Sequence, residues 1–299
     1  MLTLARAEQR LDQAQALASA DRPAEAIELL QSLVVEARRL PELRDLRSNA
    51  FDGLLQLLFA AGRHGRMAKV FRQYVADYCQ AQDPAFDGAY LDGVLVTGTA
   101  PVPLRRRDRF RLLVRQLGRT LGLPGLVAEC GCFRGLSSFL LCRTLRAHAS
   151  SFTGAGYRIF DSFQGLSAPR GEDLADDGSV EFGRLRHNIV PGHYAASLDI
   201  VRRSLKAFPG IEYFPGWIPS AFPAETESRY RFVHVDVDLY QPTLDSFEYF
   251  WPRLVPGAVV VCDDYNWPGG RRAVEEFCAR AGVAFERSPV NQAYFVKPG

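Results

Sequence analysis

The spacing of apolar residues divides the chain into an N-terminal helical part and a longer C-terminal part of mixed type. Within residues 1–82, apolar side chains recur every three or four positions, which is the period of one face of an α-helix. No run in this part reads as a convincing strand, so we predict an all-α domain of helical hairpins. The expected helices cover Leu4–Ala18, Ala26–Val34, Leu46–Leu58 and about Arg66–Tyr78.

Two turns in this helical part resemble each other. The runs Ala20–Ala26 (ADRPAEA) and Ala61–Met67 (AGRHGRM) each separate two amphipathic segments. The pattern is similar to tetratricopeptide-like hairpins, although its offset of 41 residues exceeds that family's repeat of about 34. Two interpretations stay open: a repeat module that binds a peptide or protein partner, and a helical cap that packs on the rest of the molecule or on a second subunit.

Residues 83–104 are rich in the residues that end regular structure, and we predict a linker there. Its glycines and prolines are Pro84, Gly88, Gly93, Gly98, Pro101 and Pro103. A helix with one apolar face is expected next, over Arg105–Leu121. The C-terminal domain is therefore expected to span residues 105–299.

Short, continuous apolar runs alternate with helical segments beyond Leu126. Continuous rather than alternating hydrophobicity is typical of strands buried on both faces, hence of a parallel sheet flanked by helices. The predicted strands are Leu126–Gly131, Tyr157–Phe163, Ile211–Pro215, Phe232–Asp238 and Ala258–Asp264. Phe285–Arg287 and Ala293–Lys297 are predicted to close the sheet as an antiparallel hairpin. The predicted fold class is α/β, a Rossmann-like sheet preceded by the helical domain.

Composition and charge restrict the kind of protein. The 36 basic and 34 acidic residues leave a net charge of +2, too even for binding driven by the phosphates of a nucleic acid. No run approaches the roughly 20 apolar residues that span a bilayer, and residues 1–10 do not read as a secretory signal. The six cysteines form no CxxC pair, so a zinc module is not indicated. We expect a cytoplasmic protein that contacts neither membrane nor nucleic acid.

The first predicted strand leads into the run Glu129-Cys-Gly131-Cys-Phe-Arg-Gly135, and a helix follows. A glycine turn between strand and helix lets a ligand approach the backbone closely. The spacing is not the G-x-G-x-x-G of dinucleotide sites, and Glu129 would repel a pyrophosphate but suits a cationic amino group. The alternative is a tight turn with no ligand.

The second predicted strand ends near Asp161, where an α/β sheet places the carboxylate that binds a ribose diol. The alternative is an aspartate that caps a turn. Together, Glu129 and Asp161 favour a ligand with a ribose, a cationic amino group and no phosphate. S-adenosylmethionine has these groups.

Four acids follow the next two strands: Asp236 and Asp238 after one, Asp263 and Asp264 after the other. Strands of a parallel sheet end at the same rim, so these carboxylates should lie together and repel one another. A hard divalent cation, Mg²⁺ or Mn²⁺, would relieve that repulsion. Asp236, Asp263 and Asp264 are the predicted metal ligands, while two capping and two surface acids are the alternative.

Several motifs, occurring in the same order along the chain, resemble those of the macrocin O-methyltransferase family. The members of this family are class I, S-adenosylmethionine-dependent sugar O-methyltransferases of macrolide and aminocoumarin biosynthesis. The resemblance covers residues 105–298. The motifs are Glu129–Gly135, Asp161–Gly165, Pro215–Trp217, Asp236–Tyr240 and Asp263–Tyr265. The N-terminal 80 residues lie outside the family core, and residues 165–200 match no pattern, so the acceptor does not transfer.

The resemblance implies that the methionine end lies over Glu129–Gly135, the ribose on Asp161 and the adenine near Gly216 and Trp217. The cofactor-binding residues would be Glu129, Gly131, Gly135, Ser137, Asp161, Ser162, Gly216, Trp217 and Asp236. The metal would bind vicinal hydroxyls of a sugar or secondary-metabolite acceptor, lower the pKa of one and orient it toward the sulfonium methyl. The catalytic residues would come from Asp236, Asp238, His193 and His234, the last three being alternatives for the base.

Three other functions compete with this one. A nicotinamide dehydrogenase is disfavoured by the missing glycine fingerprint and by the unexplained pair Asp263–Asp264. A helical adaptor fused to a degenerate methyltransferase is disfavoured because every predicted ligand position keeps its acid. A methyltransferase acting on nitrogen or on a peptide side chain recruited by residues 1–82 remains the runner-up.

Overall fold

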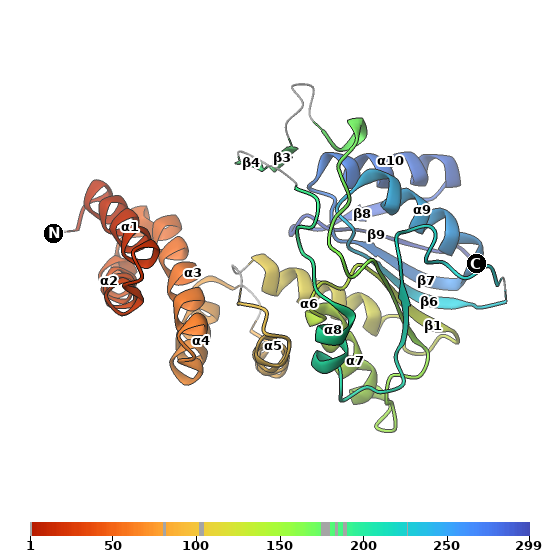
Figure 1. The fold of residues 1–299 in the computed structure, drawn as a ribbon, viewed down its shortest axis with the longest axis horizontal. Helices are drawn as coiled ribbons and strands as arrows, with labels where there is room; N and C mark the ends of the chain where they lie inside the picture. The colour runs from red at the N-terminus through yellow and green to blue at the C-terminus, as the bar shows by residue number, and fades with distance from the viewer. Residues whose placement is uncertain are drawn as a thin grey trace. The chain divides into compact units, whose positions relative to one another are not determined.

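The computed structural model describes residues 2–79, 82–101, 105–174, 180–182, 185–187, 190–225 and 227–299. The chain divides into two compact units, Met1–Arg107 and Asp108–Gly299, and the division falls inside helix α6. The elements of both units are labelled in Figure 1.

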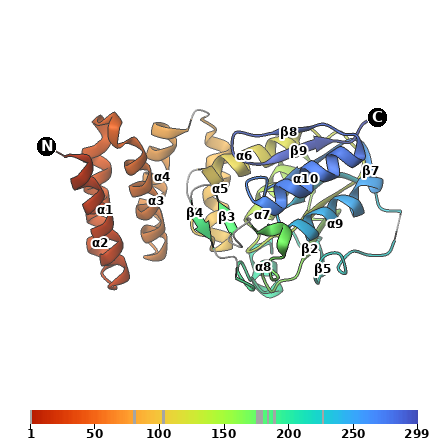
Figure 2. The same ribbon diagram turned by 90° about the horizontal axis from the view of Figure 1, so that it is seen from above.

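The first unit is all-α, as its apolar spacing predicts. Thr3 caps the first helix by accepting a hydrogen bond from the Arg6 N–H, and Pro23 opens the second at a position where no backbone N–H is needed. Each of α1 to α4 packs against the next, and Figure 2 shows them side by side. The elements are α1 Leu4–Ser19, α2 Pro23–Glu36, η1 Ala37–Arg39, η2 Pro41–Leu43, α3 Arg44–Ala60, α4 His64–Tyr78 and α5 Pro84–Thr97.

The two turns that resemble each other in sequence adopt the same backbone arrangement. Asp21 and Gly62 both take the left-handed conformation, with φ of 58° and 65°. Just after them, the N–H of Arg22 donates to the carbonyl of Leu17, as the N–H of Arg63 donates to that of Leu58. The helical hairpins are therefore confirmed, whereas their assignment as tetratricopeptide-like repeats stays a prediction.

The predicted linker over residues 83–104 is wrong for most of its length, because helix α5 occupies Pro84–Thr97. Asp83 caps this helix by accepting from the Phe86 N–H at 3.1 Å, and Gly98 ends it with a left-handed φ of 61°. The Pro and Gly that indicate loop in the sequence are here the start and stop signals of a helix.

The second unit contains a seven-stranded sheet in the order β5-β2-β1-β6-β7-β9-β8. Strands β5, β2, β1, β6 and β7 are parallel, while β9 runs antiparallel to both β7 and β8. All five predicted parallel strands and the closing hairpin are confirmed. The strands are β1 Leu126–Cys130, β2 Tyr157–Asp161, β5 Glu212–Pro215, β6 Tyr230–Val235, β7 Leu254–Cys262, β8 Phe285–Arg287 and β9 Ala293–Val296.

Helices cover both faces of this sheet (Figure 1). Buried side chains of β1, β6 and β7 form one core with α9 Tyr240–Phe250 and α10 Pro268–Ala281. Helices α7 Leu136–His148 and α8 Leu198–Ser204 lie on the other face. The central strands are thus buried on both sides, which explains their unbroken apolar runs.

The remaining elements flank this core. Segment 165–200, which matches no sequence pattern, carries η3 and a two-stranded antiparallel pair before α8. These elements are α6 Arg105–Gly118, η3 Gly171–Asp173, β3 Val180–Phe182, β4 Leu185–His187 and η4 Trp251–Arg253. None of the helices in the described parts of the chain combines the length and the apolar character that crossing a bilayer requires.

Candidate active site

Two glycines bring the backbones of the acid-bearing loops close together at the carboxyl ends of the strands. A Cβ on Gly131 would lie 1.9 Å from the carbonyl oxygen of Asp236, and one on Gly270 would lie 2.4 Å from that of Asp264. Gly131 also has a left-handed φ of 80°. The sequence analysis assigns Gly131 to a ligand, but in the structure its missing side chain first makes room for Asp236.

The four predicted acids converge at this rim. Oxygens of Asp236, Asp238 and Asp264 lie within 4.8 Å of one another, and a second such group joins Asp236 and Asp263 to His234. Asp236 belongs to both groups, so it links the two strand ends. The loop is fixed further because the Asp238 N–H donates to Asp264 Oδ2 at 2.8 Å. We call Asp236, Asp238, Asp263 and Asp264 the acid cluster.

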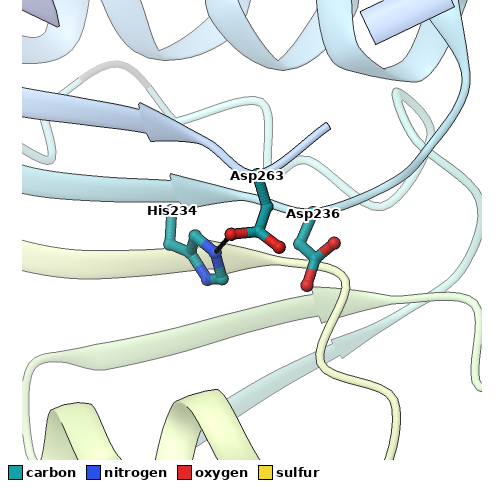
Figure 3. A group of neighbouring side chains, drawn as sticks. All are labelled: His234, Asp236 and Asp263. Carbon is teal, nitrogen blue, oxygen red and sulfur yellow. Dashed lines mark ion pairs between the residues drawn. The ribbon is translucent and has the colours of Figure 1, made fainter. Parts of the chain in front are cut away.

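Asp263 is the member of the acid cluster with the most protein partners. The guanidinium of Arg109, on α6, donates to its backbone oxygen and to Oδ2. The side-chain amide of Gln292, just before β9, donates to Oδ1. His234 Nε2 lies 3.8 Å from Oδ1, an ion-pair distance, and Figure 3 shows Asp236 beside this pair. Asp263 is thus engaged on both oxygens.

The electrostatics separate Asp263 from its neighbours. Burial, together with the charge of Asp263, raises the pKa of Asp236 to about 7. Burial, together with the charge of Asp238, raises the pKa of Asp264 well above its ordinary value. Burial also acts on Asp263, but the charge of Arg109 and the contact with His234 leave its pKa lowered. Asp236 and Asp264 are therefore harder to ionise than Asp263, which has the guanidinium of Arg109 beside it.

A buried polar chain runs from the first strand to this cluster. Both oxygens of Glu129, which is fully buried, have protein partners: Tyr157 OH donates at 2.8 Å, Ser138 Oγ donates too, and His234 Nδ1 lies at 3.0 Å. Although burial lowers the pKa of His234, its contacts with Asp263 and Glu129 raise it to about 10. His234 is thus an imidazolium at neutral pH, which weighs against its use as a base.

The predicted cofactor residues line the ends of β1, β2 and β5. Asp161 accepts hydrogen bonds from the N–H of Cys132 and of Phe163, both at 2.7 Å, so it ties the glycine turn to its own loop. The Gly216 N–H donates to the Asp161 carbonyl at 3.0 Å, and the side chain of Trp217 is 43% exposed. These residues meet along one continuous edge.

The other predicted residues differ in their surroundings. Gly135 caps α7 with a left-handed φ of 90°, and Ser137 is buried in the first turn of that helix. The hydroxyl of Ser162 donates to the Gly165 carbonyl and accepts from the Gln164 N–H, both at 3.0 Å. His193 is exposed and belongs to neither acid group. Within the described residues, the structure thus brings the acids together and leaves His193 apart.

Two residues of the site were missed by the sequence analysis. Arg109 lies in the predicted helix over Arg105–Leu121, 154 residues from Asp263, and no sequence motif marks it. Asp173 accepts from the N–H of Arg170 at 2.8 Å and of Tyr240 at 2.6 Å, and so fastens segment 165–174 to the start of α9. Gly269 leaves space for the side chain of Asp173, because a Cβ there would lie 2.3 Å from Asp173 Oδ1. The sequence alone does not show that these two residues are in contact.

The strand order, with antiparallel β9 between β7 and β8, and the glycine turn after β1 are those of a class I, S-adenosylmethionine-dependent methyltransferase. Residues 96–293 match the family model described as Macrocin-O-methyltransferase (TylF). The chain belongs to this family.

Curated relatives agree with that assignment. The chain is 31% identical over 187 residues to 8-demethyl-8-(2,3-dimethoxy-alpha-L-rhamnosyl)-tetracenomycin-C 4'-O-methyltransferase of Streptomyces olivaceus, covering 61% of this chain and 69% of that one. It is 28% identical over 191 residues to demethyldecarbamoylnovobiocin O-methyltransferase of Streptomyces niveus, covering 62% and 70%. Among solved structures, the O-methyltransferase NovP has a TM-score of 0.52 at 21% identity, covering 80% of this chain and 100% of NovP, and it supports the fold. The protein is an S-adenosylmethionine-dependent O-methyltransferase.

Proposed function

We propose that the protein methylates one hydroxyl of a vicinal diol, on a sugar or secondary-metabolite acceptor, with Mg²⁺ held by the acid cluster. The observation that carries this proposal is the convergence of four carboxylates at one rim, beside the predicted cofactor edge. The names of the relatives describe O-methylation of a rhamnosyl tetracenomycin and of a demethyldecarbamoylnovobiocin, which supports an acceptor of this class.

The residues at the rim fit a hard divalent cation. Carboxylate oxygens from Asp236, Asp238 and Asp264 lie close enough to share one ion, and oxygen ligands are those Mg²⁺ and Mn²⁺ prefer. The raised pKa of Asp236 reflects burial and repulsion that a bound cation would relieve. Asp236 and Asp264 are our main ligands. Asp263 remains the third predicted ligand, although in the structure it faces Arg109.

The cofactor edge fits a nucleoside that carries an amino acid. Asp161 keeps acceptor capacity for a ribose diol, because a carboxylate has about four lone-pair positions and the two backbone N–H groups and the Cys132 side chain occupy three. The exposed ring of Trp217 offers a face on which an adenine can stack. Because both oxygens of Glu129 have protein partners, we propose that it holds the glycine turn and His234 in place, in addition to the predicted attraction for an amino group.

S-adenosylmethionine supplies an electrophilic methyl group on a sulfonium, and a bound Mg²⁺ supplies the charge that lowers the pKa of a coordinated hydroxyl. The chain's own residues hold the two reactants in line along the rim. We propose that Asp238 accepts the hydroxyl proton, since His234 is an imidazolium and His193 lies in neither acid group. Asp236, shared by both groups, aligns the acceptor with the cofactor edge.

An acceptor series tests this function. The protein is incubated with S-adenosylmethionine, Mg²⁺ and aryl rhamnosides with free vicinal hydroxyls, and S-adenosylhomocysteine formation is measured. We expect methyl transfer to the diols and almost none to matched deoxy analogues. Equal transfer to the deoxy compounds would contradict the diol, and transfer only to amines or peptides would favour the alternative acceptor class.

A further inference from the structure

A cation supplied by the chain itself already lies in the acid cluster. The guanidinium of Arg109 donates to the backbone and side-chain oxygens of Asp263, and the two side chains are 17% and 14% exposed. Its charge acts on all four members of the acid cluster. Arg109 is therefore placed where a divalent cation would also be attracted.

Arg109 contacts Asp263 through one terminal nitrogen of its guanidinium, while its Nε is buried and has no hydrogen-bond partner among the described residues. The charge of the guanidinium acts on the four carboxylates of the acid cluster, and Arg109 donates to one of them, Asp263. Such a site still attracts a cation, but the arginine opposes that cation by charge repulsion.

Asp263 is the carboxylate for which Arg109 and a bound divalent cation would compete. It lies outside the group formed by Asp236, Asp238 and Asp264, because it faces Arg109 and Gln292 instead. An arginine stays protonated at any physiological pH, so it relieves the competition only by moving. Its side chain is 17% exposed, so the guanidinium is not completely enclosed by the protein.

We propose that Arg109 is an internal counter-ion that holds Asp263 when no divalent cation is bound and releases it when one binds. The inference rests on the proposed metal site. It assigns Arg109 a positioning role: the arginine lowers the affinity for metal and preserves the geometry of the empty cluster. The site then exchanges one cation for another instead of assembling from four repelling acids.

Binding of Mg²⁺ to the full chain, measured by isothermal titration calorimetry, tests the exchange. We expect Arg109→Gln to bind Mg²⁺ at least about 10-fold more tightly than the unmodified protein, because the competing charge is gone. Arg109→Lys keeps the charge but loses the contact with both the backbone oxygen and Oδ2 of Asp263, so we expect a smaller gain in Mg²⁺ affinity. Arg115→Gln, an exposed arginine on the same helix, is the matched control and should change nothing.

Thermal stability provides a second readout that a merely structural role would not reproduce. In chelator, Arg109→Gln should melt at a lower temperature than the unmodified protein. Added Mg²⁺ should raise the melting temperature of Arg109→Gln by more than it raises that of the unmodified protein. Equal or weaker Mg²⁺ binding by both Arg109 variants would overturn the exchange while leaving the metal site intact. Absence of binding by every protein, the unmodified one included, would overturn the metal site and the exchange with it.

Discussion

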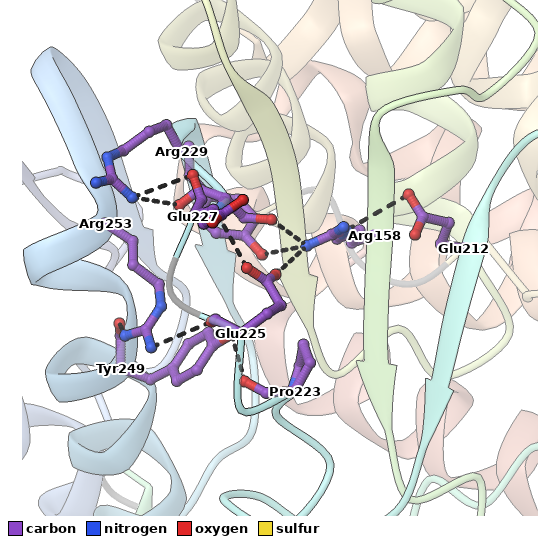
Figure 4. Close-up of polar contacts among 10 residues, drawn as sticks. Arg158, Glu212, Pro223, Glu225, Glu227, Arg229, Tyr249 and Arg253 are labelled. Carbon is purple, nitrogen blue, oxygen red and sulfur yellow. Dashed lines mark hydrogen bonds and ion pairs between the residues drawn. The ribbon is translucent and has the colours of Figure 1, made fainter.

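Acidic residues at the two ends of the same sheet have pKa values shifted in opposite directions. At the amino end, Arg158 donates to Glu225 at 3.0 Å, to Ser228 at 2.8 Å and to Tyr230 at 2.9 Å, and it pairs with Glu212 at 3.4 Å (Figure 4). Hydrogen bonds from Ser228 and Arg158 lower the pKa of Glu225 to about 2. At the carboxyl end, burial raises the pKa of Asp236 to about 7.

The difference distinguishes a structural network from the cation site that we propose. The carboxylates around Arg158 have donors that stabilise their charged form, so nothing further is needed there. In the acid cluster, Asp263 has such donors in Arg109 and Gln292, whereas the partly buried Asp236 and the buried Asp264 lie beside other acids that raise their pKa. The convergence of these carboxylates at one rim is the basis on which we propose a cation site there.

The largest expected effect comes from removing a carboxylate of the acid cluster. Asp264→Asn should lower turnover by at least about 100-fold, because the lost charge stabilisation is worth several kcal/mol. The affinity for S-adenosylhomocysteine should change little. Glu212→Gln, which removes an acid at the amino end of the sheet, is the control and should keep its activity. Equal losses of turnover and cofactor affinity in Asp264→Asn would contradict separate roles for the two edges.

Removal of the metal should have a similar effect by a different route. Excess chelator should stop methyl transfer in the unmodified protein, and added Mg²⁺ should restore it. The loss of melting temperature caused by Glu225→Gln should be the same with chelator and with Mg²⁺, since the charges around Arg158 are paired within the chain. Full turnover in excess chelator, measured as S-adenosylhomocysteine formation, would reject the metal's role in catalysis.

Asp161→Ala is expected to have an intermediate effect, on the cofactor rather than on the acid cluster. It should weaken S-adenosylhomocysteine binding by about 1–3 kcal/mol, the range for a lost hydrogen bond to a charged group. Part of that loss comes from the freed N–H groups of Cys132 and Phe163. Calorimetry with Asp161→Asn, which keeps an acceptor for these N–H groups, separates the lost ribose contact from the disturbed loop. Unchanged cofactor affinity in both Asp161 variants would place the ribose elsewhere.

The smallest expected effects are opposite changes in stability at the two ends. The raised pKa of Asp236 means that the folded state holds its proton more tightly than the unfolded state. The contribution of Asp236 is therefore present below about pH 4 and is lost as the pH rises through about 7. Glu225, whose pKa is lowered, contributes above about pH 4.5, and its contribution is lost as the pH falls through about 2.

Melting temperatures in chelator check these signs. Asp236→Asn should raise the melting temperature at pH 8 and change it less at pH 5, where Asp236 is already protonated. Glu225→Gln should lower the melting temperature at both pH values, and by less because this side chain is partly exposed. A stabilising Glu225→Gln or a destabilising Asp236→Asn at pH 8 would remove the contrast between the two ends.

The sequence predicts what depends on neighbours along the chain. The parallel strands follow from unbroken apolar runs, and the acids from their places after two of those strands. Helix α5 was not predicted because its sequence contains residues that usually indicate a loop. Pro84 and Gly98 mark its two ends, and Gly88 and Gly93 are accommodated in its interior.

What the sequence does not predict depends on contacts across the fold. Arg109 reaches Asp263 from 154 positions away, and the partners of Glu129 come from three different elements. The roles of these side chains depend on which charges face one another after folding. No local pattern records that arrangement.

Binding of Mn²⁺, followed by electron paramagnetic resonance on the metal-free protein at pH 8, tests the central claim most directly. The account predicts one bound ion per chain in the unmodified protein and in Glu212→Gln, and strongly weakened binding in Asp264→Asn and Asp236→Asn. Binding that is undiminished in both Asp variants, or no binding to the unmodified protein, would contradict it.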